Sequence, residues 1–180
     1  MKPRLLLHTC CAPCLLEPLD LWSGTFEVEV FFYNPNIQPA AEYERRSQTL
    51  RKFAEANSIV VHEPGYGPEH WTDAVGRISS ADTDRCKECY ILRLTRAAEF
   101  AGASAFEAFA TTLAVSPYQN QESIAEAGEA LSERTGIPFV YRDMTDRYRS
   151  SVEQSRALGL YRQNYCGCIP SMPQSRKNTR

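Results

Sequence analysis

The chain has 180 residues, of which 43% are hydrophobic and 23% are charged, so it can form one domain with a sizeable core and is not expected to be disordered. Its net charge of −2 gives no overall attraction to nucleic acid, and it contains neither an apolar run long enough for a membrane span nor the apolar segment of a secretory signal. We therefore expect a cytoplasmic protein with no membrane association, whose thiols stay reduced.

Strands and helices are expected to alternate along the chain. The strands are predicted at residues 4–8, 27–33, 59–62, 106–112 and 137–141, and the helices at about residues 14–22, 39–57, 69–78, 84–100, 119–134 and 148–158. This order predicts a single α/β domain over residues 1–170, with a mainly parallel, Rossmann-like sheet of about five strands and helices on both faces, resembling the ATP-pyrophosphatase or HUP-type arrangement. Residues 171–180 are expected to form a flexible tail.

Proline and glycine positions predict where the helices begin and end. Pro18 fits the first helix only if that helix starts late or is kinked. Gly102 and Gly136 are each expected to end a helix, because glycine readily adopts the left-handed conformation that follows a helix C-terminus.

Polar and sulfur-bearing residues follow the carboxyl ends of the predicted strands, where parallel sheets bind their ligands. These residues are His8-Thr9-Cys10, Tyr33-Asn34, Thr111-Thr112 and Arg142-Asp143. The first strand is followed neither by a glycine-rich dinucleotide or P-loop motif nor by the Ser-Gly-Gly-type loop of ATP pyrophosphatases. Cysteines stand where such a loop would bind phosphate, so the sequence indicates a sulfur-based site and not a nucleotide site.

All seven cysteines fall into three clusters, which are Cys10, Cys11 and Cys14, then Cys86 and Cys89, then Cys166 and Cys168. An odd number in tight clusters is unlike the disulfide framework of a small secreted domain. In a reducing compartment the pattern favours metal binding or redox chemistry.

Three kinds of site could use these cysteines. Cys11-Ala12-Pro13-Cys14 resembles a thioredoxin-like motif, in which a helix N-terminus lowers the pKa of a thiolate, but a thiol–disulfide oxidoreductase would leave the other cysteines unused. A zinc-stabilised RNA-binding module could take four thiolates from Cys86, Cys89, Cys166 and Cys168, although 76 residues separate the two pairs. An iron–sulfur centre with a second metal would use the whole set.

Charge is unevenly distributed. Residues 134–180 contain nine Arg and Lys and three Asp and Glu, a net charge of +6, whereas the preceding residues carry −8. This basic quarter is a candidate phosphate-binding face, with Arg142, Arg147, Arg149 and Arg162 as its candidate contacts. A solvated surface of mixed charge would give the same asymmetry.

Motifs from Leu7 to Cys168 together resemble the epoxyqueuosine reductases of the QueH type, with no departure at a cysteine. The motifs are His8-x-Cys10-Cys11-Ala12-Pro13-Cys14, Asn34-Pro35-Asn36-Ile37, Glu42-Tyr43, Asp84-Arg85-Cys86-x-x-Cys89-Tyr90, Arg93-Leu94, Thr111-Thr112-Leu113, Ser116-Pro117-Tyr118 and Cys166-Gly167-Cys168.

The resemblance implies an enzyme of the last step of queuosine biosynthesis, which reduces epoxyqueuosine at the wobble position of the tRNAs for Asp, Asn, His and Tyr. It further implies a 4Fe–4S cluster with an additional iron nearby, and an electron donor that the sequence does not identify. We expect all seven cysteines to ligate iron.

Four residues near the cysteines are candidates for proton transfer, each with a structural alternative. Asp84 is a candidate metal ligand or proton donor, or else a helix N-cap. Tyr90 and Tyr118 could donate a proton or stack on the modified base, or be half-buried tyrosines with wet hydroxyls. His8 could hydrogen-bond a cluster sulfur or relay protons, or be a satisfied histidine at a strand end.

A further set of residues is expected to bind substrate. Arg93 could meet a tRNA phosphate or form a salt bridge on a solvated face. Asn34 and Asn36 shape their turn or contact substrate. The remaining candidates are Thr111, Ser116 and Arg142.

Overall fold

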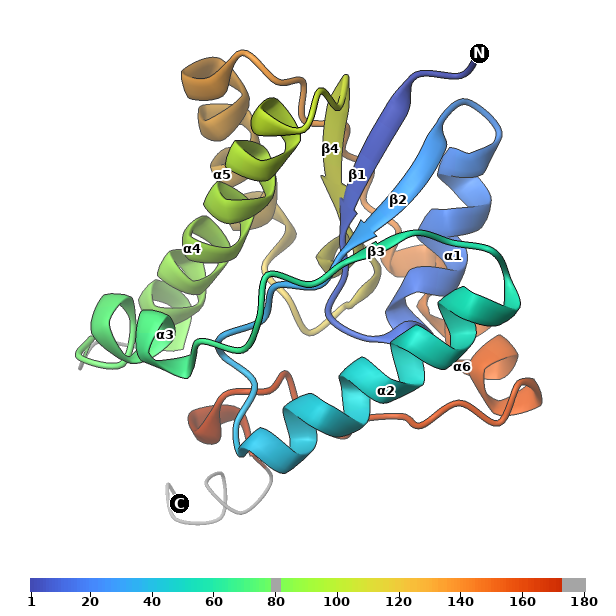
Figure 1. Ribbon diagram of the computed structural model, residues 1–180. Coiled ribbons are helices and arrows are strands. Elements are labelled where there is room, and N and C mark those ends of the chain that lie inside the picture. The colour runs from blue at the N-terminus through green and yellow to red at the C-terminus, as the bar shows by residue number, and fades with distance from the viewer. Residues whose placement is uncertain (79–81, 173–180) are drawn as a thin grey trace.

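The computed structural model describes residues 1–78 and 82–172, with the side chains of Asp82 and Thr83 excepted (Figure 1). The elements in chain order are β1 (Arg4–His8), α1 (Ala12–Ser23), β2 (Glu27–Phe31), α2 (Ala40–Ala56), β3 (Val61–His62), α3 (Pro68–Ala74), α4 (Asp82–Ala103), β4 (Ala108–Thr111), the 3-10 helix η1 (Thr112–Val115), α5 (Gln121–Thr135), η2 (Thr145–Arg147), α6 (Tyr148–Ala157) and η3 (Ile169–Ser171). No helix in these described ranges has the length and apolar character needed to cross a membrane.

The strands form one sheet in the order β3-β2-β1-β4, and every pairing is parallel. Leu6 of β1 is in register with Glu29 on one side and with Phe109 on the other. The chain builds outward from β1 through β2 to β3 and then returns to place β4 on the opposite side of β1. This reversal makes the carboxyl end of β1 the point at which an α/β sheet is expected to bind a ligand.

Helices cover both faces of the sheet because the side chains of each strand alternate between the faces. Leu5 and Leu7 pack on the side of α1 and α2, whereas Leu6 packs on the side of α4 and α5. All three leucines are completely buried, and burial of each contributes about 1.5–3 kcal/mol. Figure 1 shows the resulting three layers, with α4 and α5 on one side and α1, α2 and α6 on the other. The predicted α/β class with a parallel sheet is therefore confirmed.

The prediction of a fifth strand at residues 137–141 is wrong, because this segment makes only an isolated bridge between Phe139 and Phe109. Two backbone hydrogen bonds of 2.9 Å form it, from Phe109 N to Pro138 O and from Val140 N to Phe109 O. The ladder cannot extend toward the N-terminus, since Pro138 has no N–H to donate. It cannot extend the other way, since the chain turns into η1 directly after Thr111.

Of the two helix ends predicted at glycines, one is confirmed. Gly136 caps α5 in the left-handed region with a φ of 73°, as predicted. Helix α1 begins early, at Ala12, and contains Pro18 within its length. Helix α4 continues past Gly102 to Ala103.

The predicted C-terminal tail over residues 171–180 lies, from residue 173 onward, outside the described residues. Ser171 itself belongs to η3 and donates its hydroxyl to Cys168 O at 2.7 Å.

Replacing Gly128 by alanine should destabilise the protein. Gly128 is buried in α5, and an added Cβ would overlap the ring of Phe139. We expect the Gly128→Ala variant to lose about 1–3 kcal/mol in free energy of unfolding, because overpacking outweighs the gain in helix propensity of about 1 kcal/mol. Urea unfolding monitored by circular dichroism measures the difference.

Gly102→Ala is the matched control, since an added Cβ there would lie 3.6 Å from Ile137 Cγ1, which is an ordinary contact. This variant should be as stable as the parent chain or slightly more so. If Gly128→Ala behaved in the same way, the close packing of α5 against Phe139 would be incorrect.

Candidate metal centre

The loop after β1 gathers three thiols, with the sulfur atoms of Cys10, Cys11 and Cys14 all within 4.8 Å of one another. Cys11 is the N-cap of α1, and its Sγ accepts a hydrogen bond of 3.4 Å from Cys14 N. A sulfur in this position does what a serine or aspartate oxygen does at other helix N-termini. The helix dipole also favours negative charge there.

The three thiols are electrostatically coupled. Cys10 Sγ lies 3.8 Å from Cys11 Sγ, and hydrogen bonding from Cys11 and then from Cys14 lowers the pKa of Cys10. Burial raises the pKa of Cys11. Of the three thiols, Cys10 is the one whose pKa its neighbours lower. Because the thiolate is the form that binds metal, the triad is a competent ligand group.

The spacing of the triad suits a metal ion. Two sulfurs bound to one ion at about 2.3 Å each can be no more than about 4.6 Å apart, close to the span of this triad. Within the described part of the chain, no other group of three or more His, Cys, Asp or Glu side chains lies close enough together to share an ion.

The loop that follows β4, the neighbour of β1 in the sheet, also contacts the triad. Cys10 N donates to Thr112 Oγ1 at 3.4 Å, and the same hydroxyl lies 3.7 Å from Cys10 Sγ. The thiols thus sit beyond the carboxyl ends of neighbouring parallel strands, as the sequence predicted.

Helix α4 brings the second cysteine pair to the same region. Its spacing of three residues places Cys86 and Cys89 on one side of the helix. Cys86 packs with Tyr90 against Cys10 and Cys11, whereas Cys89 packs with Trp71 against Cys168. Helix α4 therefore connects the triad to the last cysteine pair.

The Cys166-Gly167-Cys168 loop is docked on the turn that follows β2. Gln38 N donates to Gly167 O at 2.8 Å. Gly167 has a φ of 140°, and an added Cβ would lie 2.9 Å from both Asn36 Nδ2 and Ile37 Cγ1. Only glycine allows this backbone conformation and this close approach.

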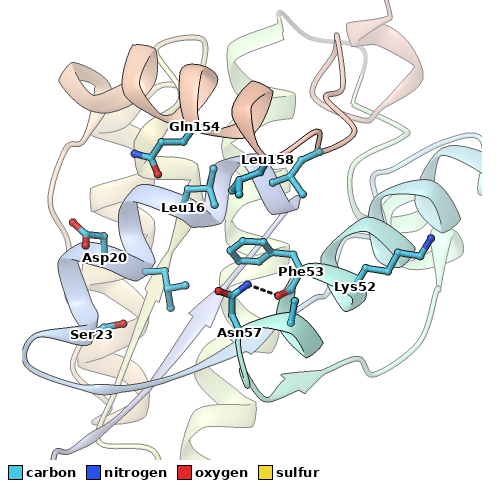
Figure 2. A pocket seen from close by; sticks show the side chains of 11 residues that line it. Leu16, Asp20, Ser23, Lys52, Phe53, Asn57, Gln154 and Leu158 are labelled. Atoms are coloured by element: carbon cyan, nitrogen blue, oxygen red, sulfur yellow. Dashed lines mark hydrogen bonds between the residues drawn. The ribbon is translucent and has the colours of Figure 1, made fainter.

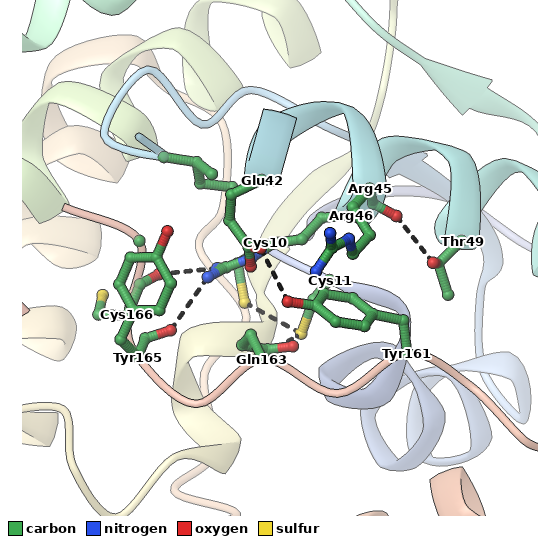
Figure 3. A network of polar contacts seen from close by, with 12 residues as sticks. Cys10, Cys11, Glu42, Arg45, Arg46, Thr49, Tyr161, Gln163, Tyr165 and Cys166 are labelled. Atoms are coloured by element: carbon green, nitrogen blue, oxygen red, sulfur yellow. Dashed lines mark hydrogen bonds and ion pairs between the residues drawn. The ribbon is translucent and has the colours of Figure 1, made fainter. Parts of the chain in front are cut away.

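A buried arginine on α2 holds the segment before this loop (Figure 3). Arg46 donates from Nη1 to Cys166 O at 2.8 Å and from Nη2 to Tyr165 O at 3.1 Å. Its Nε pairs with Glu42 at 2.7 Å, and Glu42 also accepts a hydrogen bond of 2.7 Å from the Tyr161 hydroxyl. The arginine is only 1% exposed, so its charge is compensated inside the protein.

Gln163 joins the same segment to the triad. Its Nε2 donates to Cys11 Sγ at 2.8 Å and lies 3.8 Å from Cys14 Sγ. Figure 3 shows the amide beside Cys11, at the edge of the Arg46 network. Gln163 thus donates a hydrogen bond to the sulfur that caps α1, the thiol whose pKa burial raises.

Several buried donors around the cysteines lack an acceptor among the described residues. They are both Nη atoms of Arg93, Nε1 of Trp71 and Nδ2 of Asn36. Trp71 packs against Cys89, and Asn36 touches Gly167 between the last two cysteines. Buried donors need acceptors, so this arrangement fits a bound anionic group with sulfur acceptors.

Two of the predicted proton-transfer residues are buried and hydrogen-bonded. His8 accepts from Thr111 Oγ1 at Nδ1 over 2.9 Å and donates from Nε2 to Tyr33 O over 3.2 Å. Burial, with Arg93 nearby, lowers the pKa of His8 to about 3, so the ring is neutral. The Tyr90 hydroxyl donates to Gln119 Oε1 at 2.9 Å, and burial raises the pKa of Tyr90.

The other two lie outside the cluster. Asp84 is exposed and is the third residue of α4, so it is not the N-cap of that helix. Tyr118 is 79% exposed and packs edge-on against Tyr148, with ring centroids 5.8 Å apart.

Burial corrects part of the expected substrate-binding set. Arg93 is 1% exposed, so it neither meets a tRNA phosphate at the surface nor lies on a solvated face. Asn34 and Thr111 are also buried, with Asn34 Nδ2 donating to Thr9 O at 2.9 Å and Thr111 Oγ1 accepting from Leu113 N at 3.2 Å. These side chains thus stabilise the backbone just before Cys10 and just after β4. Asn36 is buried in the same way, against the Cys-Gly-Cys loop.

Ser116 and Arg142 differ from this buried set. Ser116 shapes its loop by accepting a hydrogen bond of 3.3 Å from Tyr118 N at its side chain, whereas Arg142 is exposed.

The sequence pattern did not indicate three residues of the site, which are Arg46, Gln163 and Trp71. The spacing of Glu42 and Arg46 is that of an i,i+4 ion pair, but the same spacing is common on solvated helices. Only tertiary packing buries this pair. Gln163 lies three residues before Cys166, which is a signal of proximity and not of role.

The centre is separate from a groove of ≈ 630 Å³ between α1, α2 and α6 (Figure 2). Leu16, Phe53 and Leu158 line this groove, together with polar residues such as Asn57 and Gln154. None of its lining residues is a cysteine or another predicted site residue.

Comparison with known proteins identifies a family. A family model described as epoxyqueuosine reductase QueH matches residues 5–174. Relatives with the same description include one from Dehalococcoides mccartyi, 38% identical over 95% of this chain and 93% of the relative, and one from Thermotoga maritima, 37% identical over 96% and 92%.

A solved structure shares the fold. The predicted subunit of a tRNA methyltransferase from Methanocaldococcus jannaschii aligns with a TM-score of 0.56 and 11% identity, over 84% of this chain and 74% of that chain. At this identity the likeness concerns the arrangement of the elements alone.

Replacing Arg46 by methionine should strongly destabilise the protein. The change leaves the buried Glu42 carboxylate without its partner and frees the carbonyls of Tyr165 and Cys166. Loss of one partner of a buried ion pair costs about 3–5 kcal/mol in free energy of unfolding. Urea unfolding of the cofactor-free protein measures this loss.

Arg51→Met on the same helix is the matched control, because Arg51 pairs with Glu63 but is 61% exposed. It should cost only about 0–1 kcal/mol. The double variant Glu42→Gln with Arg46→Met should cost less than the sum of the single changes, since it leaves no unpaired charge. Equal effects of Arg46→Met and Arg51→Met would contradict the assigned role of Arg46.

Proposed function

Because the chain belongs to the QueH family of epoxyqueuosine reductases, we propose that it reduces epoxyqueuosine to queuosine at the wobble position of tRNA. The observation that carries this proposal is the thiol triad after β1, together with helix α4, which packs Cys86 against the triad and Cys89 against Cys168. A cytoplasmic setting is part of the proposal, because all seven cysteines are free thiols.

The reaction removes the oxygen of an epoxide. Both C–O bonds break, a C=C bond forms between the two ring carbons, and the oxygen leaves as water after taking up two protons. The balance requires two electrons, which come from an external low-potential donor that delivers them singly.

The proposed cofactors are a 4Fe–4S cluster and an additional iron, held by the seven cysteines. The residues fit such a group, because the triad has the spacing of metal ligands and the buried donors of Arg93, Trp71 and Asn36 lack acceptors. When bound, the cofactors would supply single electrons and a Lewis-acidic iron for the epoxide oxygen.

The side chains at the outer edge of the site have the properties needed to receive the substrate. Tyr118 is exposed and lies against Tyr148, whose own neighbours include Cys14 and Arg162. An exposed aromatic face can stack on a nucleobase, and such stacking is worth about 1–3 kcal/mol per base. In this proposal Tyr118 holds the wobble base or its neighbour, and the exposed carboxyl group of Asp84 is a proton source.

The tRNA partner would carry epoxyqueuosine in the anticodon loop of the Asp, Asn, His or Tyr isoacceptors. Its wobble base must leave the loop stack to reach the cysteines, at modest cost because it is already unpaired. Arg142, Arg149 and Arg162 are exposed and suited to the phosphates beside that loop. Arg147 is less suited, because it pairs with the buried Glu17 at 3.1 Å.

Two other functions make different predictions. A thiol–disulfide oxidoreductase using Cys11 and Cys14 would be colourless and would tolerate loss of Cys166 and Cys168. A zinc-stabilised RNA-binding module would contain zinc, lack redox activity and unfold on chelation.

Protein purified without oxygen should be brown and contain several irons and sulfides per chain. Cys10→Ser and Cys166→Ser should each lower the iron content and reduce the rate of epoxyqueuosine tRNA reduction by dithionite about 100-fold or more, because even residues that only support metal ligands contribute about 10–100-fold. Elemental analysis and a nucleoside assay of digested tRNA measure both quantities.

Ala54→Ser is the control for a serine at a buried position, because Ala54 is 2% exposed and lies on α2 in the opposite half of the helix from Glu42. It should retain iron and activity. A parent protein that holds only zinc after anaerobic purification would exclude the reductase mechanism, and a cysteine variant with normal iron and activity would remove that cysteine from the ligand set.

Binding of a tRNA anticodon stem–loop should weaken steeply with salt. Arg149→Ala and Arg162→Ala should each reduce the slope of log affinity against log salt concentration by about 1, because each removes one phosphate contact. Fluorescence anisotropy with labelled RNA at several salt concentrations measures the slope.

Lys2→Ala is the control, because Lys2 precedes β1 at the end of the sheet opposite the cysteines and donates to Ser23 O. Its slope should equal that of the parent protein. An unchanged slope in both arginine variants would place the RNA on another surface.

A further inference from the structure

Arg93 is a buried cation without a carboxylate partner. It lies on α4 one helical turn after Cys89 and is 1% exposed. Its Nε donates to Cys89 O at 3.3 Å, but neither Nη atom has a hydrogen-bond partner in the described part of the chain. A buried charge that is neither paired nor fully hydrogen-bonded is strongly unfavourable, so it is retained only where something else compensates it.

The contrast with Arg46 shows that this is not a general property of buried arginines here. Arg46 is equally buried, yet its Nε, Nη1 and Nη2 all have acceptors, in Glu42 and in two backbone carbonyls. The hydrogen-bonding groups of Arg46 are therefore satisfied without a cofactor, whereas the Nη groups of Arg93 are not.

The groups around Arg93 indicate which kind of acceptor its Nη groups would bind. The potentially anionic neighbours that act on its guanidinium are Cys89, Cys166 and Cys10, one from each cysteine cluster, followed by Tyr90. The Tyr90 ring centroid lies 5.9 Å from Arg93 Cζ. The guanidinium thus lies within electrostatic range of one thiol from each cluster, and its unused N–H groups require anionic acceptors there.

We propose that Arg93 is the internal counter-charge of the iron–sulfur centre, with its Nη groups hydrogen-bonded to cluster or cysteine sulfur and its charge raising the reduction potential. This inference rests on the proposed function, since it requires the cluster. An iron–sulfur cluster with four thiolate ligands is anionic, and its potential depends on nearby charge and on hydrogen bonds to its sulfurs. A fixed cation in a low-dielectric interior favours the more negative, reduced state.

The test compares three variants of the full chain, each reconstituted with iron and sulfide under anaerobic conditions. Arg93→Met removes the charge and keeps most of the volume, and Arg93→Lys keeps the charge but loses the fork of donors. Arg96→Met is the matched control, because Arg96 is on the same helix, three residues further on, with its side chain 49% exposed and paired with Glu99.

The main measurement is a redox titration of the centre with dithionite as the one-electron donor, followed by electron paramagnetic resonance. At a fixed potential, Arg93→Met should have at least a tenfold lower ratio of reduced to oxidised centre than the parent, which corresponds to a shift of about 59 mV for one electron. Arg93→Lys should shift less, and Arg96→Met should not shift.

A second measurement remains informative if Arg93→Met fails to retain the cluster. In the cofactor-free protein the unpaired cation is destabilising, so Arg93→Met should raise the melting temperature while accelerating cluster loss from the loaded protein. An arginine with a merely structural role would lower the melting temperature when replaced, whether or not the cluster is present.

The outcomes separate this inference from the function on which it rests. If the parent holds an iron–sulfur centre but Arg93→Met leaves its potential and its retention unchanged, the counter-charge role is overturned and the reductase function stands. A lower melting temperature of cofactor-free Arg93→Met also overturns it. If the parent assembles no iron–sulfur centre, the proposed function itself fails.

Discussion

The position of β1 between two parallel neighbours is the constraint on which the rest of the molecule depends. Its leucines are completely buried on both faces, and its pairing with β2 and β4 brings the loops after all three strands to one edge of the sheet. The direction of chain winding reverses at this strand, so the loop that carries Cys10 and Cys11 faces a space that neither neighbouring connection crosses. The helix that follows then directs its N-terminus at the same place.

Those features of the fold that follow from local pattern could be predicted from the sequence. The aliphatic run before His8, the alternation of strands and helices, and the clustering of cysteines at strand ends are all visible without a structure. The isolated bridge at Phe139 could not be predicted, because it depends on where β4 turns away after Thr111 as well as on the missing N–H of Pro138. A run of residues with high strand propensity indicates neither condition.

The orientation of polar side chains was harder to predict than their proximity. Arg93 was predicted at the surface and His8 beside a cluster sulfur, yet both side chains are buried, where Arg93 lacks acceptors for its Nη groups and His8 has both ring nitrogens hydrogen-bonded. Helical or strand periodicity assigns a face but not the polarity of what packs on that face, so a buried arginine cannot be distinguished from a surface arginine by spacing. The burial of Arg46 could not be predicted for the same reason.

The two buried arginines also bear on which chemistry the thiols can perform. Hydrogen bonds from Cys11 and Cys14 lower the pKa of Cys10, and the charges of Arg93 and Arg46 lower it further. A disulfide between Cys11 and Cys14 would remove the two thiols whose hydrogen bonds lower the pKa of Cys10, and would leave Gln163 beside a neutral disulfide. Oxidation would therefore leave a positively charged interior with less compensation than the reduced protein has. An arrangement that needs persistent negative charge on sulfur suits permanent metal ligation better than a cycle of thiol–disulfide exchange, in which that charge is lost in every turnover.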